Sequence, residues 1–85
     1  MSSQIELQKI VDLIYSGKLD DAEIGILKLL DLQKNNFLLF NIYGVILLKK
    51  NNSDLAIEQF KKSIDINCQF PDAYYNLGTV LFRSA

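Results

Sequence analysis

The sequence repeats its own pattern with a 34-residue period. At that shift, small residues align with small residues and apolar or aromatic residues with their own kind: Gly44 with Gly78, Ala22 with Ala56, Phe40 with Tyr74, Leu30 with Ile64, and Leu32 with Ile66. A period of this length is typical of stacked supersecondary units, because one such unit cannot bury its apolar face alone. The repetition constrains the fold more than any other feature of the chain.

Each unit is predicted to hold two helices. Apolar residues recur at spacings of three and four, which is the helical period, over five segments: 4–16, 19–33, 37–50, 55–67 and 71–85. Gly17 is expected to end the first helix in the left-handed conformation that glycine adopts readily. Asp20 or the preceding turn can cap the second helix, the polar turn 51–54 can cap the fourth, and Pro71 suits the first turn of the fifth.

Length and composition limit the classes of function. The 85 residues can form one domain at most, and 49% hydrophobic against 22% charged residues predicts that it folds. Nine basic against ten acidic residues create no field that would attract a phosphate backbone, so we expect no nucleic-acid partner. The longest apolar run, 37–48, is shorter than the roughly 20 residues of a membrane-spanning helix, so we expect a buried helix and no membrane partner.

Catalytic and metal sites find little support. Cys68 is the only cysteine and the chain has no histidine, so neither a disulfide nor a cysteine-based zinc site can form within it. A reducing compartment, the cytoplasm, fits best, and the mature chain is expected to start at Met1, which no secretory signal follows. We interpret Cys68 as a small buried apolar residue, and adjacent Asp20 and Asp21 as helix-end charges. We therefore expect no enzyme and no cofactor.

The 34-residue unit resembles the tetratricopeptide repeat, and its middle copy carries the most matches. These are Phe40-x-x-Tyr43-Gly44 followed by Ala56 and Phe60, and the next copy opens with Tyr74-Tyr75-Asn76-Leu77-Gly78. The resemblance implies one all-α domain over 1–85, a TPR-like α-solenoid of five helices in antiparallel pairs. Its parts would be a divergent capping repeat with a polar outer face (3–36), a full repeat (37–70) and the first helix of an incomplete third (71–85). Gly44, Gly78 and Ala56 would allow close approach between helices.

The resemblance also implies that the first helix of each repeat lines a concave groove. Residues one period apart on those helices form the predicted partner-binding set: Val11, Ile14, Asn41, Ile42, Val45, Leu48, Lys49, Tyr75, Asn76, Thr79, Phe82 and Arg83. This groove would be mainly apolar, with amides inside it and a basic rim at Lys49 and Arg83 that favours an acidic residue or a carboxyl terminus. In the alternative, Leu48 and Phe82 are covered by neighbouring repeats or by a second copy.

Two known binding patterns of the family are not reproduced. The basic set that grips a carboxylate in chaperone-binding members is absent. Only Asn76 represents the row of asparagines that follows the groove in repeats ahead of sugar-transferring enzymes. The expected function is a protein–protein interaction module that takes a partner peptide or helix. The first alternative is the N-terminal, substrate-recruiting segment of a larger enzyme of the transferase type.

The last helix carries more apolar residues than the preceding helices can cover. Leu77, Val80 and Leu81 are predicted to self-associate, making a homodimer and a structural role the second alternative. In the competing expectation, the chain is the start of a longer adaptor or enzyme, and the next helix lies beyond Ala85.

Overall fold

The computed structural model describes residues 3–84, without the side chains of Ser3 and Ser84. All regular structure in this range is helical, as predicted, and each helix begins and ends within two residues of its expected bounds. The five helices are α1 (Ser3–Tyr15), α2 (Leu19–Leu32), α3 (Phe37–Lys49), α4 (Ser53–Ile66) and α5 (Pro71–Ser84).

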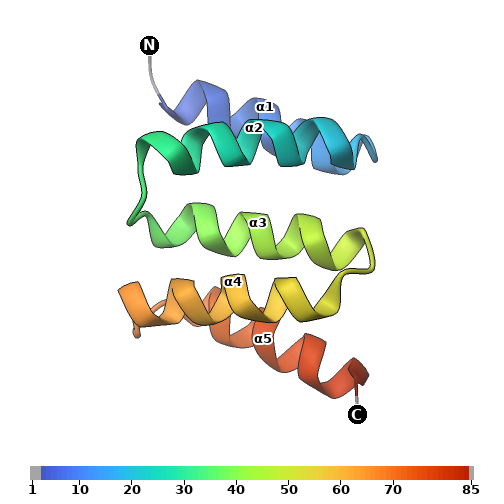
Figure 1. The fold of residues 1–85 in the computed structure, drawn as a ribbon, viewed down its shortest axis with the longest axis vertical. Coiled ribbons are helices and arrows are strands. Elements are labelled where there is room, and N and C mark those ends of the chain that lie inside the picture. Colours follow the sequence, from blue (N-terminus) through green and yellow to red (C-terminus); the bar gives the residue numbers. More distant parts are fainter. Residues whose placement is uncertain (1–2, 85) are drawn as a thin grey trace.

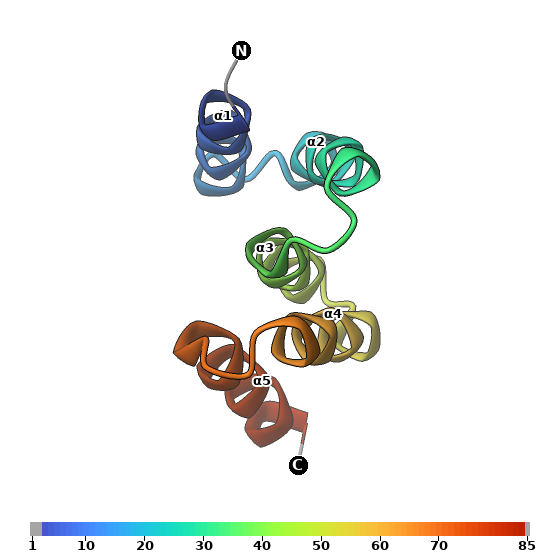
Figure 2. The same cartoon turned by 90° about the vertical axis from the view of Figure 1, so that its left-hand side faces the viewer.

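The helices form two layers. Viewed end-on, α1, α3 and α5 lie in one layer, and α2 and α4 lie in the other (Figure 2). Successive helices run in opposite directions and stack into an elongated body of 40 × 27 × 18 Å (Figure 1). Each helix packs on the next one in the chain, and α3 also contacts α5. The structure is therefore an open helical array, as the repeat period predicts.

The two turns that follow the first helices of the repeats have the same geometry. Gly17 and Asn51, one repeat period apart, both take the left-handed conformation, with φ of 80° and 65°. In each turn the next residue's N–H donates to the carbonyl five residues earlier, at 2.9 and 2.8 Å. This bond belongs to the Schellman motif, and asparagine tolerates the left-handed region best after glycine. The predicted helix end at Gly17 is confirmed.

Asparagine side chains cap two helices. Asn36 Oδ1 accepts the Leu38 N–H at 3.0 Å at the start of α3, and Asn52 Oδ1 accepts the Leu55 N–H at 3.4 Å at the start of α4. The cap predicted in the turn 51–54 is thus present. Asp20 does not cap α2, because it lies inside the first turn and the residue before the helix, Lys18, makes no side-chain cap bond.

The core consists of two clusters that share α3. The first lies among α1, α2 and α3 and contains Ile10, Ala22, Ile26, Leu29, Leu39 and Ile46. The second lies among α3, α4 and α5 and contains Leu47, Ala56, Phe60 and Val80. Because adjacent residues point in different directions on a helix, Ile46 and Leu47 reach different clusters. Helix α3 therefore connects the two halves of the array.

Helices α3 and α4 are in close contact at Gly44. A Cβ built on Gly44 would lie 2.7 and 2.8 Å from Cδ1 and Cζ of the Phe60 ring, which is fully buried. The predicted role of Gly44 is confirmed, and Ala56, one turn before Phe60, is also fully buried. For Gly78 the same prediction is wrong: a Cβ there would meet nothing within 4 Å, because no described helix covers that side of α5.

The outer face of the first repeat is less polar than expected. Four charged residues do lie along the trough between α1 and α2: Glu6, Lys9, Asp21 and Lys28. Between them, however, Leu13, Ile24 and Leu32 also line the trough, and Ile24 and Leu32 are exposed. The polar capping face is thus present only as a charged rim around apolar side chains.

Candidate functional site

A hollow of about 280 Å³ lies between α1 and α3. It is lined by Val11, Ile14, Tyr15, Ile42, Val45 and Lys49. All but Lys49 offer apolar or aromatic surface. These residues come from two helices held at a fixed distance by the first core cluster, so the hollow is built on rigid elements.

A second hollow, of about 360 Å³, lies between α3 and α5. It is lined by Val45, Leu48, Lys49, Asn51, Asn76 and Arg83. Val45 and Lys49 line both hollows, so the two form one continuous surface across α1, α3 and α5, which we call the groove face. Its apolar floor changes toward amide and basic groups at the α5 side.

Eight of the predicted partner-binding residues line the groove face: Val11, Ile14, Ile42, Val45, Leu48, Lys49, Asn76 and Arg83. Tyr15 and Asn51 line it as well. Tyr15 lies one repeat period before Lys49, so the period itself places it in the same column. Asn51 was interpreted only as a turn residue.

Four predicted residues lie elsewhere. Asn41 is only 8% exposed, and its Oδ1 accepts a hydrogen bond from Asn76 Nδ2 at 3.0 Å, so it is not the open contact predicted for a partner. The reason is that α5 packs over this part of α3. Thr79 donates its hydroxyl to the Tyr75 carbonyl at 2.9 Å, and Tyr75 and Phe82 are exposed outside both hollows.

The predicted self-association set is divided by the fold. Val80 is 1% exposed and belongs to the second core cluster, and Leu77 packs against that cluster. Including Val80 was therefore wrong, because the α5 face that carries it is already covered by α3 and α4. Only Leu81 remains exposed from that set.

Residues 44–84 match the family model of the TPR repeat, from the Gly44 contact through α4 and α5. The tetratricopeptide repeat (TPR) is thus shown over these residues. No curated protein matches the chain. The repeat of this family is generally a protein–protein interaction module, and stacked repeats present extended surfaces for that purpose.

The groove face is basic at its rim. Lys49 and Arg83 line the second hollow, and no aspartate or glutamate of the described residues lines either hollow. Within residues 3–84, neither cation takes part in an ion pair. Their charge is thus not cancelled locally and extends over the apolar floor.

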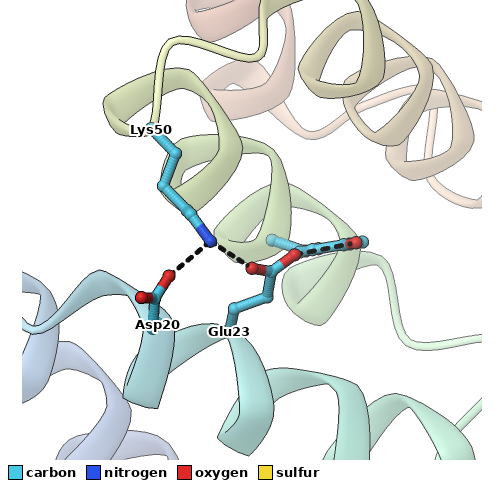
Figure 3. Close-up of polar contacts among 4 residues, drawn as sticks. Asp20, Glu23 and Lys50 are labelled. Carbon is cyan, nitrogen blue, oxygen red and sulfur yellow. Dashed lines mark hydrogen bonds and ion pairs between the residues drawn. The ribbon is translucent and has the colours of Figure 1, made fainter.

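Lys50, the residue after Lys49, does form ion pairs. Lys50 Nζ lies 2.6 Å from Asp20 Oδ1 and 2.6 Å from Glu23 Oε1, and Tyr43 donates its hydroxyl to Glu23 Oε2 at 3.4 Å (Figure 3). Hydrogen bonds to Asp20 and then Glu23 raise the pKa of Lys50 above its ordinary value. Burial, and next the Glu23 charge, raises the pKa of Tyr43. We call these four residues the Lys50 cluster; it ties the start of α2 to the end of α3.

Sequence reasoning missed the Lys50 cluster because its members come from two repeats. Two features of the sequence point toward it: carboxylates in the first turn of α2 and a lysine that ends α3. The carboxylates were interpreted only as helix-end charges, whose effect is confined to one helix.

The remaining candidate groups are spread out. Cys68 is exposed in the turn between α4 and α5, so its interpretation as a buried residue was wrong. Within the described range, histidine, cysteine, aspartate and glutamate nowhere gather in threes that could hold a metal ion. In the same range, every helix is too short or too polar to cross a membrane.

Proposed function

We propose that this chain is a non-catalytic interaction module whose groove face binds a segment of a partner protein. The observation that carries the proposal is the continuity of the two hollows at Val45 and Lys49. A continuous apolar floor suits successive side chains of one peptide, since burial of apolar surface contributes about 25 cal/mol per Å².

The polar groups of the groove face narrow the chemistry of the partner. Lys49 and Arg83 favour a segment that carries an acidic side chain or ends in a free carboxylate. Asn76 donates one side-chain N–H to Asn41, which holds the amide in place. Its carbonyl oxygen can then accept a backbone N–H of the bound segment, which an extended peptide has to satisfy.

Selection of a random peptide library on the purified chain tests the proposal. We expect the selected peptides to combine apolar residues with an acidic residue or terminal carboxylate. When these peptides are titrated in, the backbone NMR signals of Val11, Val45 and Lys49 should shift at lower peptide concentrations than those of the outer α2 residues.

Charge reversal gives a fold-neutral variant because Lys49 is exposed. Lys49→Glu should raise the dissociation constant of the selected peptides about tenfold, because the rim then carries the same charge as the acidic group of the peptide. Lys28→Glu makes the same charge change at the trough between α1 and α2 and should leave binding unchanged. An equal loss of peptide affinity in both variants would show that net charge alone causes the effect, and it would refute a groove-face site.

A further inference from the structure

One face of α5 is apolar and exposed among the described residues. It carries Tyr74, Gly78, Leu81 and Phe82, which we call the α5 outer face. Tyr74 is 48% exposed and Phe82 is 84% exposed. Residues spaced by three and four lie on one side of a helix, so this is a single strip and not scattered surface positions. It lies apart from the hollows of the groove face, which Asn76 and Arg83 of α5 line.

The repeat period gives the two central members of this strip, Gly78 and Leu81, counterparts on α3. Gly44 corresponds to Gly78, and Leu47 corresponds to Leu81. On α3 these positions are covered by α4, with the Phe60 ring against Gly44. On α5 the equivalent surface, at Gly78 and Leu81, is exposed. A helix is therefore the kind of structure that fits it, with the crossing at the glycine.

The strip is complementary to itself. Tyr74 and Phe82 each lie four residues from Gly78, on opposite sides of it. If two α5 helices cross antiparallel at Gly78, each Tyr74 meets the Phe82 of the other copy, and the pair forms twice. A two-fold interface needs this relation between residues, whereas a contact with an unrelated helix does not. Aromatic pairs of this kind add about 0.5–1.5 kcal/mol beyond area burial.

Space and charge also permit the crossing. A Cβ at Gly78 would meet nothing within 4 Å, so the backbone of α5 is open to close approach there. No charged residue belongs to the α5 outer face. Arg83, the basic residue of the last turn, lines the second hollow instead. Two copies could thus meet without placing like charges in the contact.

We propose that two copies of this chain associate through α5, antiparallel and two-fold symmetric, with Gly78 at the crossing. The groove face of each copy stays open, so the dimer presents two binding surfaces. This proposal is independent of the function proposed above. Because the contact runs along one 14-residue helix, it is smaller than the roughly 800 Å² per partner of a standard interface. The dimer should accordingly be weak and form with increasing concentration.

Sedimentation equilibrium across micromolar to millimolar concentrations tests the association. The parent chain should shift from monomer to dimer. Gly78→Leu keeps the monomer intact, because its side chain points into open space and leucine favours helix over glycine, but it fills the crossing point. We expect the dissociation constant to rise at least about tenfold. Leu32→Ser removes an exposed apolar side chain from the first repeat and should change nothing.

Disulfide trapping tests the symmetry. In a Cys68→Ser background, Gly78→Cys should crosslink two copies rapidly, because a two-fold axis at this residue brings the same position of both chains within the roughly 7 Å that a disulfide spans. Lys61→Cys, on the exposed surface of α4, should crosslink only slowly. A chain that stays monomeric at every concentration, a dimer that Gly78→Leu leaves unchanged, or equal crosslinking at both positions would each overturn the proposal.

Discussion

Helices α3 and α5 are two versions of the same element, one repeat period apart, in different surroundings. Leu47 on α3 is 2% exposed, whereas its counterpart Leu81 on α5 is 49% exposed. Gly44 is pressed against Phe60, whereas Gly78 meets nothing. The residue types are the same, so the difference comes entirely from the helix that lies over α3. Burial in a repeat array is thus set by the neighbouring repeat as much as by the sequence of the helix itself.

Truncation of the two leucines should give the largest contrast. Leu47→Ala removes a buried side chain from the second core cluster and should lower the free energy of unfolding by about 2–5 kcal/mol. Leu81→Ala should cost less than about 1 kcal/mol, because half of that side chain already contacts water. Urea unfolding at a low protein concentration, where α5 is unpaired, measures both. Equal losses would show that α5 is covered in solution by something the fold lacks.

Alanine at the two glycines should change stability in opposite directions. At Gly44 the new methyl group displaces the buried Phe60 ring and should cost about 1–3 kcal/mol. At Gly78 the methyl group meets nothing, and the better helix propensity of alanine should add up to about 1 kcal/mol. Thermal unfolding of the matched pair reports the sign directly. Stabilisation at Gly44 would mean that the Phe60 ring is free to move aside.

The junctions before α3 and before α5 differ in a second way. At the first, Glu23 and Tyr43 are part of the Lys50 cluster. At the second, their counterparts Ile57 and Leu77 pack against the second core cluster. One junction is therefore sensitive to pH and the other is apolar. Of the three predicted differences in stability, this effect of pH should be the smallest, since Asp20 and part of Lys50 remain in contact with water.

The sign of the pH effect follows from the two raised pKa values. The folded chain holds the protons of Lys50 and Tyr43 more tightly than the unfolded chain does. Their contribution is complete below the ordinary pKa values of about 10 and is lost as pH rises through the folded ones. The Tyr43→Phe, Lys50→Met double variant should therefore lose less stability between about pH 8 and about pH 11 than the parent. Lys61→Met, which removes a lysine outside the cluster, should follow the parent, and a parent-like slope in the double variant would contradict the assignment.

Local signals in the sequence were sufficient for the helices and for the Gly44 contact. Gly17 and Pro71 mark helix ends through their own backbone preferences, and the repeat period identifies Gly44, Ala56 and Phe60 as packing residues. These features depend on one helix or one helix pair. Local backbone preferences and the repeat period together therefore predict them.

Features that depend on the relation between repeats were not predictable in the same way. Val80 and Asn41 were assigned to surfaces, yet α5 packs on α3 and α4 and buries both. The Lys50 cluster joins side chains of two different repeats, for which no helical spacing gives a signal. Eight of the twelve residues predicted for the groove do line its hollows, because residues one period apart keep similar orientations on α1 and α3. On α5 the correspondence fails for Tyr75, Thr79 and Phe82, which line neither hollow.

The contacts of the array also bear on how the chain folds. Every substantial contact joins helices that are consecutive or, for α3 and α5, separated by one helix. Few distant segments have to find one another, so loop-closure entropy is small and folding should be fast. We expect the Gly44 contact, enclosed between α3 and α4, to form early and α1 and α5 to join later and open first. The chain would then spend part of its time with its central pair formed and its two ends loose.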